Sequence, residues 1–211
     1  MVSQRPSLLI DTNVWLDYFL PDRAGGKEAI DLIVFAFEYE FPLLYPAAIV
    51  KDVFYVAVST FKRIARAEKG SLTQSDAVTA TETAWGCVNS MRKQATAVGA
   101  DESDLWTACN LRSIHNDLED NLVVAAAQRA DATYLVTNDE ALIKHAPVAA
   151  LAPADALALL KATLYKRRGG RRRPPLQLVV IPAARVSWRP SRGFPVVPGA
   201  SGPARRAPRP W

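Results

Sequence analysis

Short apolar runs along the chain alternate with longer segments in which apolar residues recur every three or four positions. Residues 7–10 (SLLI) form one such run, which is typical of a short strand buried on both faces. Residues 47–67 show the second pattern, and the segment ends near Gly70, a residue that commonly terminates helices. Alternation of the two patterns predicts a parallel sheet covered by helices on both faces.

The same patterns predict one α/β domain over residues 1–165, a three-layer α/β/α arrangement around a central, mostly parallel, twisted sheet. The predicted strands are residues 7–10, 41–45, 95–98, 132–137 and 148–151. The predicted helices are residues 11–19, 27–40, 47–67, 71–93, 101–114, 117–130 and 153–164. No internal repeat is evident, so one domain is the expectation for a chain of this length.

Charge is distributed unevenly along the chain, whose formal net charge is +5. Residues 1–160 hold 13 Lys+Arg and all 21 Asp+Glu, a net charge of −8, whereas residues 161–211 hold 13 Lys+Arg and no acid. The C-terminal part also holds 9 of the 15 prolines and 5 of the 10 glycines, so we predict a disordered basic tail over residues 166–211. Such a tail would attract RNA or DNA, although the same composition also arises when translation continues past the proper end of a domain.

Two cysteines, Cys87 and Cys109, are too few for a disulfide framework and lack the second pair that a structural zinc site needs. We expect both to be buried thiols in a reducing cytosol. The first residues show no basic segment followed by a long apolar one, and charge or proline interrupts every apolar stretch before about 18 residues. These patterns favour a cytoplasmic protein with no membrane partner.

Four aspartates stand at positions that meet on one edge of such a sheet. Asp11 directly follows the first predicted strand, and Asp139 follows the fourth. Asp52 lies near the start of the helix after the second strand, and Asp120 lies in the first turn of the helix that begins at Asp117. Since the functional crevice of an open α/β sheet lies at the carboxyl ends of its strands, we expect the four carboxylates to converge. Helix capping alone would explain any one of them but strains to explain all four.

Crowded carboxylates repel one another unless a cation neutralises them, and oxygen ligands of this kind suit Mg²⁺ or Mn²⁺. Such an ion can hold a phosphodiester and lower the pKa of a bound water that attacks phosphorus, so we expect phosphodiester hydrolysis. Histidine-based chemistry is a poor alternative, because no serine or cysteine stands in a recognisable nucleophile elbow. We expect His115 and His145, the two histidines of the chain, to be surface or capping residues.

Two stretches that carry these aspartates resemble the motifs of a known family. LLIDTNVWLDYF, residues 8–19, is similar to the opening motif of PIN-domain ribonucleases, and DLEDNLVVAAAQRADATYLVTND, residues 117–139, is similar to their closing motif. The resemblance spans about residues 7–163 and is strongest to the VapC-like toxins of type II toxin-antitoxin systems. It implies a PIN-like fold and a Mg²⁺- or Mn²⁺-dependent endoribonuclease that leaves a 5′-phosphate and a 3′-hydroxyl. It also implies a protein antitoxin as a partner.

The resemblance assigns roles to individual residues. It implies that Asp11, Asp120 and Asp139 are catalytic and bind the metal ion. It also implies that Asn13 orients a water on that ion and that Thr137 supports the same water or the phosphate. These five side chains would together form the centre of the site.

Two further acidic positions are less closely matched to the family. Asp117 lies one helical turn before Asp120 and is expected to support the site. Where the family usually has a glutamate, early in the long helix, this chain has Asp52 with Lys51 beside it. We expect Asp52 to act as a catalytic carboxylate, and the alternative is an exposed charge paired with Lys51 or Lys27.

The departure at Asp52 supports a second hypothesis, a degenerate PIN domain that binds RNA or a protein partner without cleavage. A third hypothesis is a phosphatase with an aspartyl nucleophile. That chemistry would need a second aspartate two residues after Asp11, where this chain has Asn13. We therefore prefer the nuclease and retain the non-cleaving binder as its alternative.

An acidic body needs local cations to hold RNA. The candidate phosphate contacts around the crevice are Lys51, Arg112 and Lys144, together with Lys62, Arg63 and Arg66. Solvated surface is the alternative role for each of them. Asp17 on the first predicted helix is expected to lie on the surface.

Aromatic residues fall mostly at helical spacing, which usually indicates core positions. Those expected in the core are Trp15, Phe19, Phe35, Phe37, Phe54, Tyr55, Trp85 and Trp106. Trp15 or Tyr18 could instead stack on a base, line a homodimer contact, or receive an apolar helix of an antitoxin.

Overall fold

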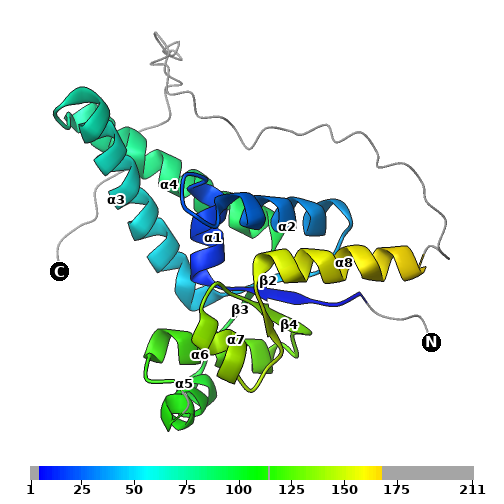
Figure 1. The fold of residues 1–211 in the computed structure, drawn as a ribbon. Coiled ribbons are helices and arrows are strands. Elements are labelled where there is room, and N and C mark those ends of the chain that lie inside the picture. The colour runs from blue at the N-terminus through cyan, green and yellow to red at the C-terminus, as the bar shows by residue number, and fades with distance from the viewer. Residues whose placement is uncertain (1–4, 114, 168–211) are drawn as a thin grey trace, which may run out of the picture. The chain divides into compact units, whose positions relative to one another are not determined.

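A five-stranded parallel sheet lies at the centre of the structure (Figure 1). This computed structural model describes residues 5–113 and 115–167. The strands are β1 (Leu8–Ile10), β2 (Leu43–Pro46), β3 (Thr96–Val98), β4 (Tyr134–Val136) and β5 (Ala150–Leu151). Their order across the sheet is β3-β2-β1-β4-β5, and every neighbouring pair is parallel. All five predicted strands are confirmed, each within a few residues of its predicted bounds.

The α-helices of the described residues are α1 (Thr12–Phe19), α2 (Gly26–Glu38), α3 (Val50–Lys69), α4 (Gln74–Gln94), α5 (Glu102–Asn110), α6 (Leu118–Arg129), α7 (Glu140–His145) and α8 (Pro153–Arg167). Two short 3-10 helices, η1 (Ala47–Ile49) and η2 (Leu111–Ser113), precede α3 and follow α5. The sequence predicted all of the α-helices except α7, because six residues are too few for a helical periodicity to show.

Helices cover both faces of the sheet, which confirms the predicted three-layer α/β/α architecture. In Figure 1, α2 and α8 lie on one side of the strands, and α5, α6 and α7 lie on the other. The helix α2 packs against α1 and α8, whereas α6 packs against α5 and against the strands β2 and β4. Because both faces are covered, β1 carries only apolar residues, and all three of them are fully buried.

The direction in which the chain adds strands to the sheet reverses between β1 and β4. From β1 the chain continues to β2 and β3 on one side, whereas from β4 it continues to β5 on the other. Leu9 pairs with Leu135 and Ile10 pairs with Val136, so the carboxyl ends of these two strands lie side by side. In open α/β sheets a crevice forms at such a switch point. The fold therefore brings Asp11, which follows β1, to the segment that follows β4.

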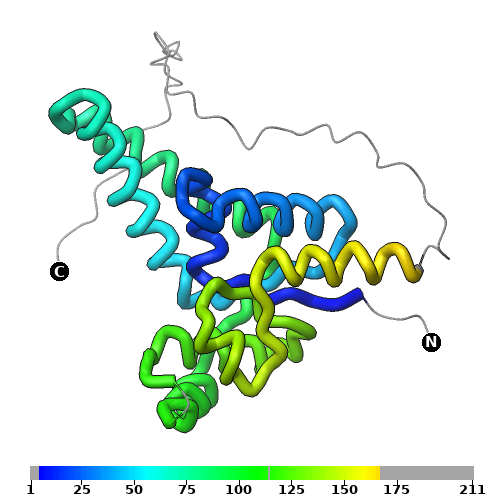
Figure 2. Tube along the Cα trace, in the orientation of Figure 1, coloured from blue at the N-terminus to red at the C-terminus, as the bar shows by residue number. Residues whose placement is uncertain are grey.

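The two longest helices, α3 and α4, pack against each other as a hairpin that projects from the sheet (Figure 2). Gly70 ends α3 with a φ of 75°, a left-handed conformation that favours glycine. Thr73 and Asp76 form a capping box at the start of α4, and Lys69 forms an ion pair with Asp76 across the turn. Local hydrogen bonds and charge thus hold the tip of the α3–α4 hairpin.

The predicted core is only partly confirmed. Trp15 is fully buried, which agrees with a core position and leaves no face of its ring for a base or a partner. Phe37, Tyr55, Trp85 and Trp106 are 53%, 66%, 51% and 70% exposed, so the prediction that they lie in the core was wrong. Helical spacing reveals an apolar face of a helix but does not show whether another element covers it.

Other predictions concern the thiols, the membrane and the tail. Cys87 is buried, and burial raises its pKa to about 11, whereas Cys109 is exposed and the prediction that it is buried was wrong. None of the helices in the described ranges is long and apolar enough to cross a membrane. The predicted disordered tail, residues 166–211, lies outside the described residues except for Lys166 and Arg167, which end α8.

Candidate metal centre

Three helices begin at the edge of the sheet where the strands end, and an aspartate caps each of them. Asp11 caps α1, Asp117 caps α6 and Asp139 caps α7, in each case by accepting a hydrogen bond from a backbone N–H of the first turn. Capping explains why aspartate occurs at each of these positions. The positive ends of the three helix dipoles also favour anions, such as phosphate, at this edge.

Asp11 is 3% exposed, and both of its carboxylate oxygens accept hydrogen bonds. The oxygen Oδ1 accepts from the backbone N–H of Thr12 at 2.6 Å. The oxygen Oδ2 accepts from Asn13 Nδ2 and from Thr137 Oγ1, both at 2.7 Å. Thr137 Oγ1 also accepts from the N–H of Asp139 at 3.0 Å. A single buried hydroxyl therefore joins the end of β1 to the start of α7.

Asn13 links this network to the loop between β4 and α7. Its Oδ1 accepts from the backbone N–H of Asn138 at 3.1 Å, and Asn138 Nδ2 donates to Asp17 Oδ2 at 2.7 Å. Arg23 forms an ion pair with the same carboxylate. Asp17 is buried, so the prediction of a surface role for it was wrong. It instead supports the loop that carries Asp139.

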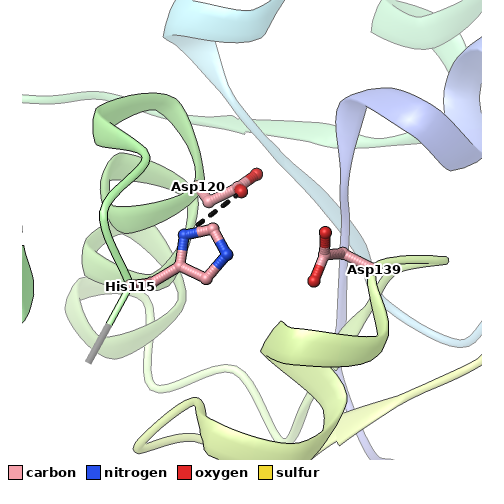
Figure 3. A group of neighbouring side chains, drawn as sticks. All are labelled: His115, Asp120 and Asp139. Carbon is pink, nitrogen blue, oxygen red and sulfur yellow. Dashed lines mark ion pairs between the residues drawn. The ribbon is translucent and has the colours of Figure 1, made fainter.

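Asp120 and Asp139 meet a third side chain, that of His115. Each of the three offers one ligand atom, and these atoms lie within 4.8 Å of one another. Figure 3 shows one ring nitrogen of His115 beside Asp120 and the other directed toward Asp139. The distance from His115 Nδ1 to Asp120 Oδ2 is 3.4 Å. The same nitrogen accepts the N–H of Asp117 at 3.3 Å, which matches the expected capping role, but the place of His115 in the site was not predicted.

Burial dominates the electrostatics of Asp11. It raises the pKa of this carboxyl to about 6, and the hydrogen bonds from Thr137 and Thr12 oppose that rise. The negative charges of Asp120 and Glu119 add to the rise. Asp11 therefore feels the carboxylates at the start of α6, although it lies outside the group formed by His115, Asp120 and Asp139, and its role as a metal ligand stays a prediction.

Asp120 lies in a similarly acidic environment. Burial raises its pKa, and the negative charges of Asp117 and Asp139 contribute to the rise, whereas His115 lowers it. Within the described ranges, no Lys or Arg forms an ion pair with Asp11, Asp120 or Asp139. In the part of the chain that the structure describes, the three carboxylates at this edge are thus left without a Lys or Arg partner.

Asp117 and Glu119 flank Asp120 at the start of α6. Asp117 Oδ1 accepts from the N–H of Glu119 at 2.8 Å and from that of Asp120 at 3.4 Å. Thr12 Oγ1 donates to Glu119 Oε1 at 3.5 Å, so Glu119 faces the start of α1. Asp117 is engaged in capping, and both residues add negative charge around Asp120.

Asp52 is not brought into the same group. Among the residues that the structure describes, the cluster able to hold a metal ion consists of His115, Asp120 and Asp139. The carboxylate of Asp52 instead accepts from Lys51 Nζ at 2.6 Å. This contact matches the alternative expectation for Asp52, and its role as a catalytic carboxylate stays a prediction.

The cations predicted to contact RNA are carried by α3, η2 and α7. Lys51 is in the first turn of α3, and its pKa is raised by the hydrogen bond to Asp52 and further by Glu119. Arg112 is exposed on η2, and Lys144 in the last turn of α7 forms an ion pair with Glu140 at 3.0 Å. The more distant Lys62, Arg63 and Arg66 lie on the second half of α3, in the α3–α4 hairpin.

The donor set fits a divalent metal ion. Asp120 and Asp139 offer carboxylate oxygens, which Mg²⁺ and Mn²⁺ prefer, and Asp11 lies close enough to feel the charge of Asp120. Repulsion among these groups would be relieved by such an ion. An ion held here would lie beside the N-termini of α6 and α7, where phosphate is also favoured.

Comparisons with known proteins identify the family of the chain. A chain of the crystal structure of VapBC2 from Rickettsia felis bound to a DNA fragment from its promoter is similar to this protein, with a TM-score of 0.49 and 10% identity over 69% of this chain and 98% of that chain. No curated protein matches the sequence. Residues 7–141 match the PIN domain, a span that runs from β1 into α7 and includes every aspartate of the site. The chain therefore belongs to the PIN domain family.

Proposed function

We propose that this protein is a metal-dependent endoribonuclease that hydrolyses RNA phosphodiesters with Mg²⁺ or Mn²⁺. The observation that carries the proposal is the meeting of Asp120 and Asp139 beside buried Asp11, at the switch point between β1 and β4, without a cationic side chain among the described residues to balance them. PIN domains are generally nucleases, and acidic ligands around a divalent ion suit that chemistry.

In this proposal the residues of the site divide the work. Asp120 and Asp139 hold the ion, and Asp11 is a third carboxylate ligand whose position is set by Thr137 and Asn13. When bound, a divalent ion stabilises charge on the phosphate oxygens and lowers the pKa of a water molecule. The amide of Asn13, fixed by its hydrogen bonds at both ends, orients the attacking water.

RNA would lie across the carboxyl ends of the strands. Lys51, Arg112 and Lys144 surround that edge and would bind phosphates, which positions the strand without reading its sequence. Replacing any one of them should weaken binding to all RNA sequences alike and reduce the dependence of binding on salt concentration. Cleavage specificity would then arise from other features.

The experiment that tests the proposal is electrophoresis of structured cellular RNA incubated with the purified protein. Lanes with Mg²⁺ or Mn²⁺ are compared with a chelator lane and with the variants Asp120→Asn and Asp139→Asn. The matched control is Asp131→Asn, which removes one negative charge at the amino end of β4, where a φ of 47° is tolerated by asparagine. We expect discrete fragments from the wild type and from the control, and intact RNA from the site variants.

Two results would contradict the nuclease. Fragments that survive chelation would exclude metal dependence, and fragments that survive Asp120→Asn would exclude this site. Intact RNA in every lane, from a folded protein freed of any inhibitor, would favour the second candidate, a PIN domain that binds RNA or a protein without cleavage.

The contact between Lys51 and Asp52 is the observation that favours this second candidate, because it occupies the charge of an expected catalytic carboxylate. An Asp52→Asn variant separates the two roles. If Asp52 is catalytic, the RNA cleavage rate of this variant falls. If Asp52 only pairs with Lys51, the cleavage rate stays as in the wild type. In the latter case the nuclease proposal stands on Asp11, Asp120 and Asp139 alone.

We also propose that the protein is the toxin of a VapC-like toxin-antitoxin pair that acts in the cytoplasm, on the strength of the two sequence motifs. The α3–α4 hairpin offers exposed apolar side chains for a protein antitoxin or for a second copy of the chain: Tyr55, Val56, Ile64, Val78 and Trp85. Sedimentation of the purified protein, alone and with the product of a neighbouring gene, would reveal a homodimer or a complex. A protein that remains a monomer with every candidate partner would contradict both.

The proposed domain boundary, with a nuclease domain over residues 1–165 and a separate tail over residues 166–211, can be tested by truncation. Because α8 ends at Arg167, the chain is best cut after that residue. We expect the shortened protein to fold and to cleave RNA like the full chain. Loss of folded protein would show that the tail belongs to the domain.

A further inference from the structure

We propose that the imidazole of His115 is a nitrogen ligand of the divalent ion at this centre, and that the centre therefore prefers Mn²⁺ to Mg²⁺. The inference rests on the metal centre of the proposed function and adds the chemistry of one of its ligands. His115 lies outside both sequence motifs, residues 8–19 and 117–139, so the resemblance to PIN-domain ribonucleases assigns it no role.

The distances around His115 suit a shared ion. One atom from each of His115, Asp120 and Asp139 lies within 4.8 Å of the others, and the distance from His115 Nδ1 to Asp120 Oδ2 is 3.4 Å. Three atoms bound to one ion at about 2.1 Å lie roughly 3.0–3.6 Å from one another, so the contact of 3.4 Å already has this spacing, and atoms within 4.8 Å need to approach by roughly 1–2 Å, which side-chain rotation can supply. In Figure 3 both carboxylates lie on one side of the ring, with Asp120 beside one nitrogen and Asp139 across from the other.

The backbone that carries the ring is held in place before any ion binds. The backbone N–H of His115 donates to the carbonyl of Leu111 at 3.0 Å, and its own carbonyl accepts from Asn121 Nδ2 at 2.8 Å. Asn121 is 2% exposed on α6, so this second bond ties the loop to the core. The N–H of Asp117 also donates to Nδ1 at 3.3 Å, and it must give up this contact when the nitrogen becomes a ligand, because a neutral imidazole has a single acceptor nitrogen. Since the backbone on either side is held, only the side-chain torsions of His115 need to be ordered when the ion binds.

A simple ion pair between His115 and Asp120 is a weaker account of the same geometry. A protonated imidazole would balance one negative charge, but Asp120 also faces Asp117, Glu119 and Asp139. One positive charge therefore leaves most of the repulsion in place. A divalent ion bound by the neutral ring and two carboxylates removes more of it.

A nitrogen ligand changes which ion binds best. Mg²⁺ and Mn²⁺ both favour oxygen ligands, and Mg²⁺ in addition demands near-ideal octahedral geometry and gives up its waters reluctantly. Mn²⁺ is a transition-metal ion and accepts an imidazole nitrogen more readily than Mg²⁺, although less readily than the later transition metals. Removing the imidazole should therefore weaken the binding of Mn²⁺ by about tenfold, a typical cost of perturbing a metal site, and should change the binding of Mg²⁺ much less. The difference between the two ions is the quantity that identifies His115 as a ligand.

The test uses full-length protein without a histidine tag, loaded with Mn²⁺ and measured by pulsed electron paramagnetic resonance. A histidine ligand produces a characteristic coupling between Mn²⁺ and the imidazole ¹⁴N. The chain has two histidines, so His145→Gln is the matched control: His145 is exposed at the end of α7 and lies outside the cluster. We expect the coupling in the wild type and in His145→Gln, and its loss in both His115→Gln and His115→Asn.

Titration of Mn²⁺ and of Mg²⁺ into the same proteins measures the affinity of each variant for the two ions. A ¹⁴N coupling that persists in both His115 variants, or an equal loss of affinity for the two ions, would overturn the inference. Mn²⁺ that binds the wild type without a ¹⁴N coupling but is lost in Asp120→Asn would overturn the role of His115 and leave the metal centre standing. Absence of Mn²⁺ binding to the wild type would overturn both the inference and the proposed metal centre.

Discussion

Buried aspartates occur in two parts of this molecule, and the groups that contact their carboxylates differ between the two parts. Away from the site, Asp76 and Asp104 are buried, and each forms an ion pair with a basic side chain, Lys69 and Arg129 respectively. At the edge of the sheet Asp11 is equally buried, and its partners are a backbone N–H, an amide and a hydroxyl. Burial alone therefore does not decide whether a carboxylate receives a cation here.

The pKa values show the consequence. Hydrogen bonds from Lys69 and then Thr73 lower the pKa of Asp76 to about 2, and Arg129 lowers that of Asp104. The pKa of Asp11 is instead raised to about 6 by burial. The paired aspartates stabilise the fold in their charged form, whereas the site holds carboxylates whose charge the fold does not balance. Such a site is prepared for an external cation at some cost in stability.

The largest expected effect is the loss of RNA cleavage in the variant Asp120→Asn, which should not be accompanied by a loss of stability. We expect Asp120→Asn to lower the RNA cleavage rate by about 100-fold or more, because a ligand of the ion is lost. The free energy of unfolding should stay the same or rise, since repulsion from Asp117 and Asp139 is relieved. Initial rates and urea unfolding of the same preparation would check both. A large loss of stability would place Asp120 with the structural aspartates and break the comparison.

For Arg129→Met we expect the opposite of the Asp120→Asn result, a loss of stability without a loss of RNA cleavage. Arg129 Nε contacts both oxygens of Asp104 at 2.9 Å, so its loss leaves a buried carboxylate without its cation. We expect the Tm to fall by about 3–6 °C, with RNA cleavage unchanged at a temperature where the variant is folded. The matched control is Arg92→Met, also in the last turn of a helix, where the arginine is exposed and contacts Asn89 at 3.4 Å. A Tm that falls as much in the control would show that the Asp104 pair contributes nothing specific.

The variant Gly25→Ala tests Asp17, the buried aspartate with a basic partner that lies closest to the site. A Cβ on Gly25 would come within 2.2 Å of Asp17 Oδ2 and 3.3 Å of Asn138 Nδ2, so Gly25→Ala must displace the Asp17 carboxylate. We expect a loss of about 1–3 kcal/mol of stability and slower cleavage, because Asn138 adjoins Asp139. Urea unfolding and cleavage rates measure the two effects.

Gly86→Ala is the control for that substitution. Its Cβ would meet nothing within 4 Å, and the residue lies inside α4, so stability should rise by about 0.5–1 kcal/mol. If the two glycine variants behave alike, the contact between Asp17 and the β4–α7 loop is unimportant for positioning the site.

The smallest expected effect is a pair of opposite pH dependences in metal-free buffer. Since the folded pKa of Asp11 is about 6 against an ordinary 3.8, its contribution to stability falls as the pH rises from about 4 to about 6. Since the folded pKa of Asp76 is about 2, its contribution is present above about pH 4 and is lost as the pH falls toward 2. Tm measured from pH 2 to pH 7 should lose the first trend in Asp11→Asn and the second in Asp76→Asn. Slopes of the same sign for both residues would contradict the assigned pKa shifts.

The elements of this fold were predictable because long amphipathic segments and short apolar runs leave clear periodicities, as in α3 and β1. Asp11, Asp120 and Asp139 were predictable because they occur at element boundaries within two motifs. Their roles as metal ligands remain to be tested. For these elements and these three aspartates, the local sequence contains the information needed to predict their positions.

The remaining features depend on contacts between distant segments. His115 reaches the site through a loop that Asn121 ties down, and the burial of Asp17 depends on Arg23 and Asn138, neither of which it meets through helical spacing. The exposure of Trp85 and Trp106 likewise depends on which faces other helices leave uncovered. Tertiary packing decides these matters, and a pattern along one chain does not record it.

The pairing of β1 with β4 has a consequence for biosynthesis. Asp11 and Thr137, which share a hydrogen bond, are separated by 126 residues, so the ribosome must release most of the domain before β1 can pair with β4. Until then the N-terminal aspartate is present without the groups that complete its surroundings. Under the proposed function, a growing polypeptide of this design would be harmless to the message from which it is translated, and the capacity to cut RNA would arise only after β4 has left the ribosome.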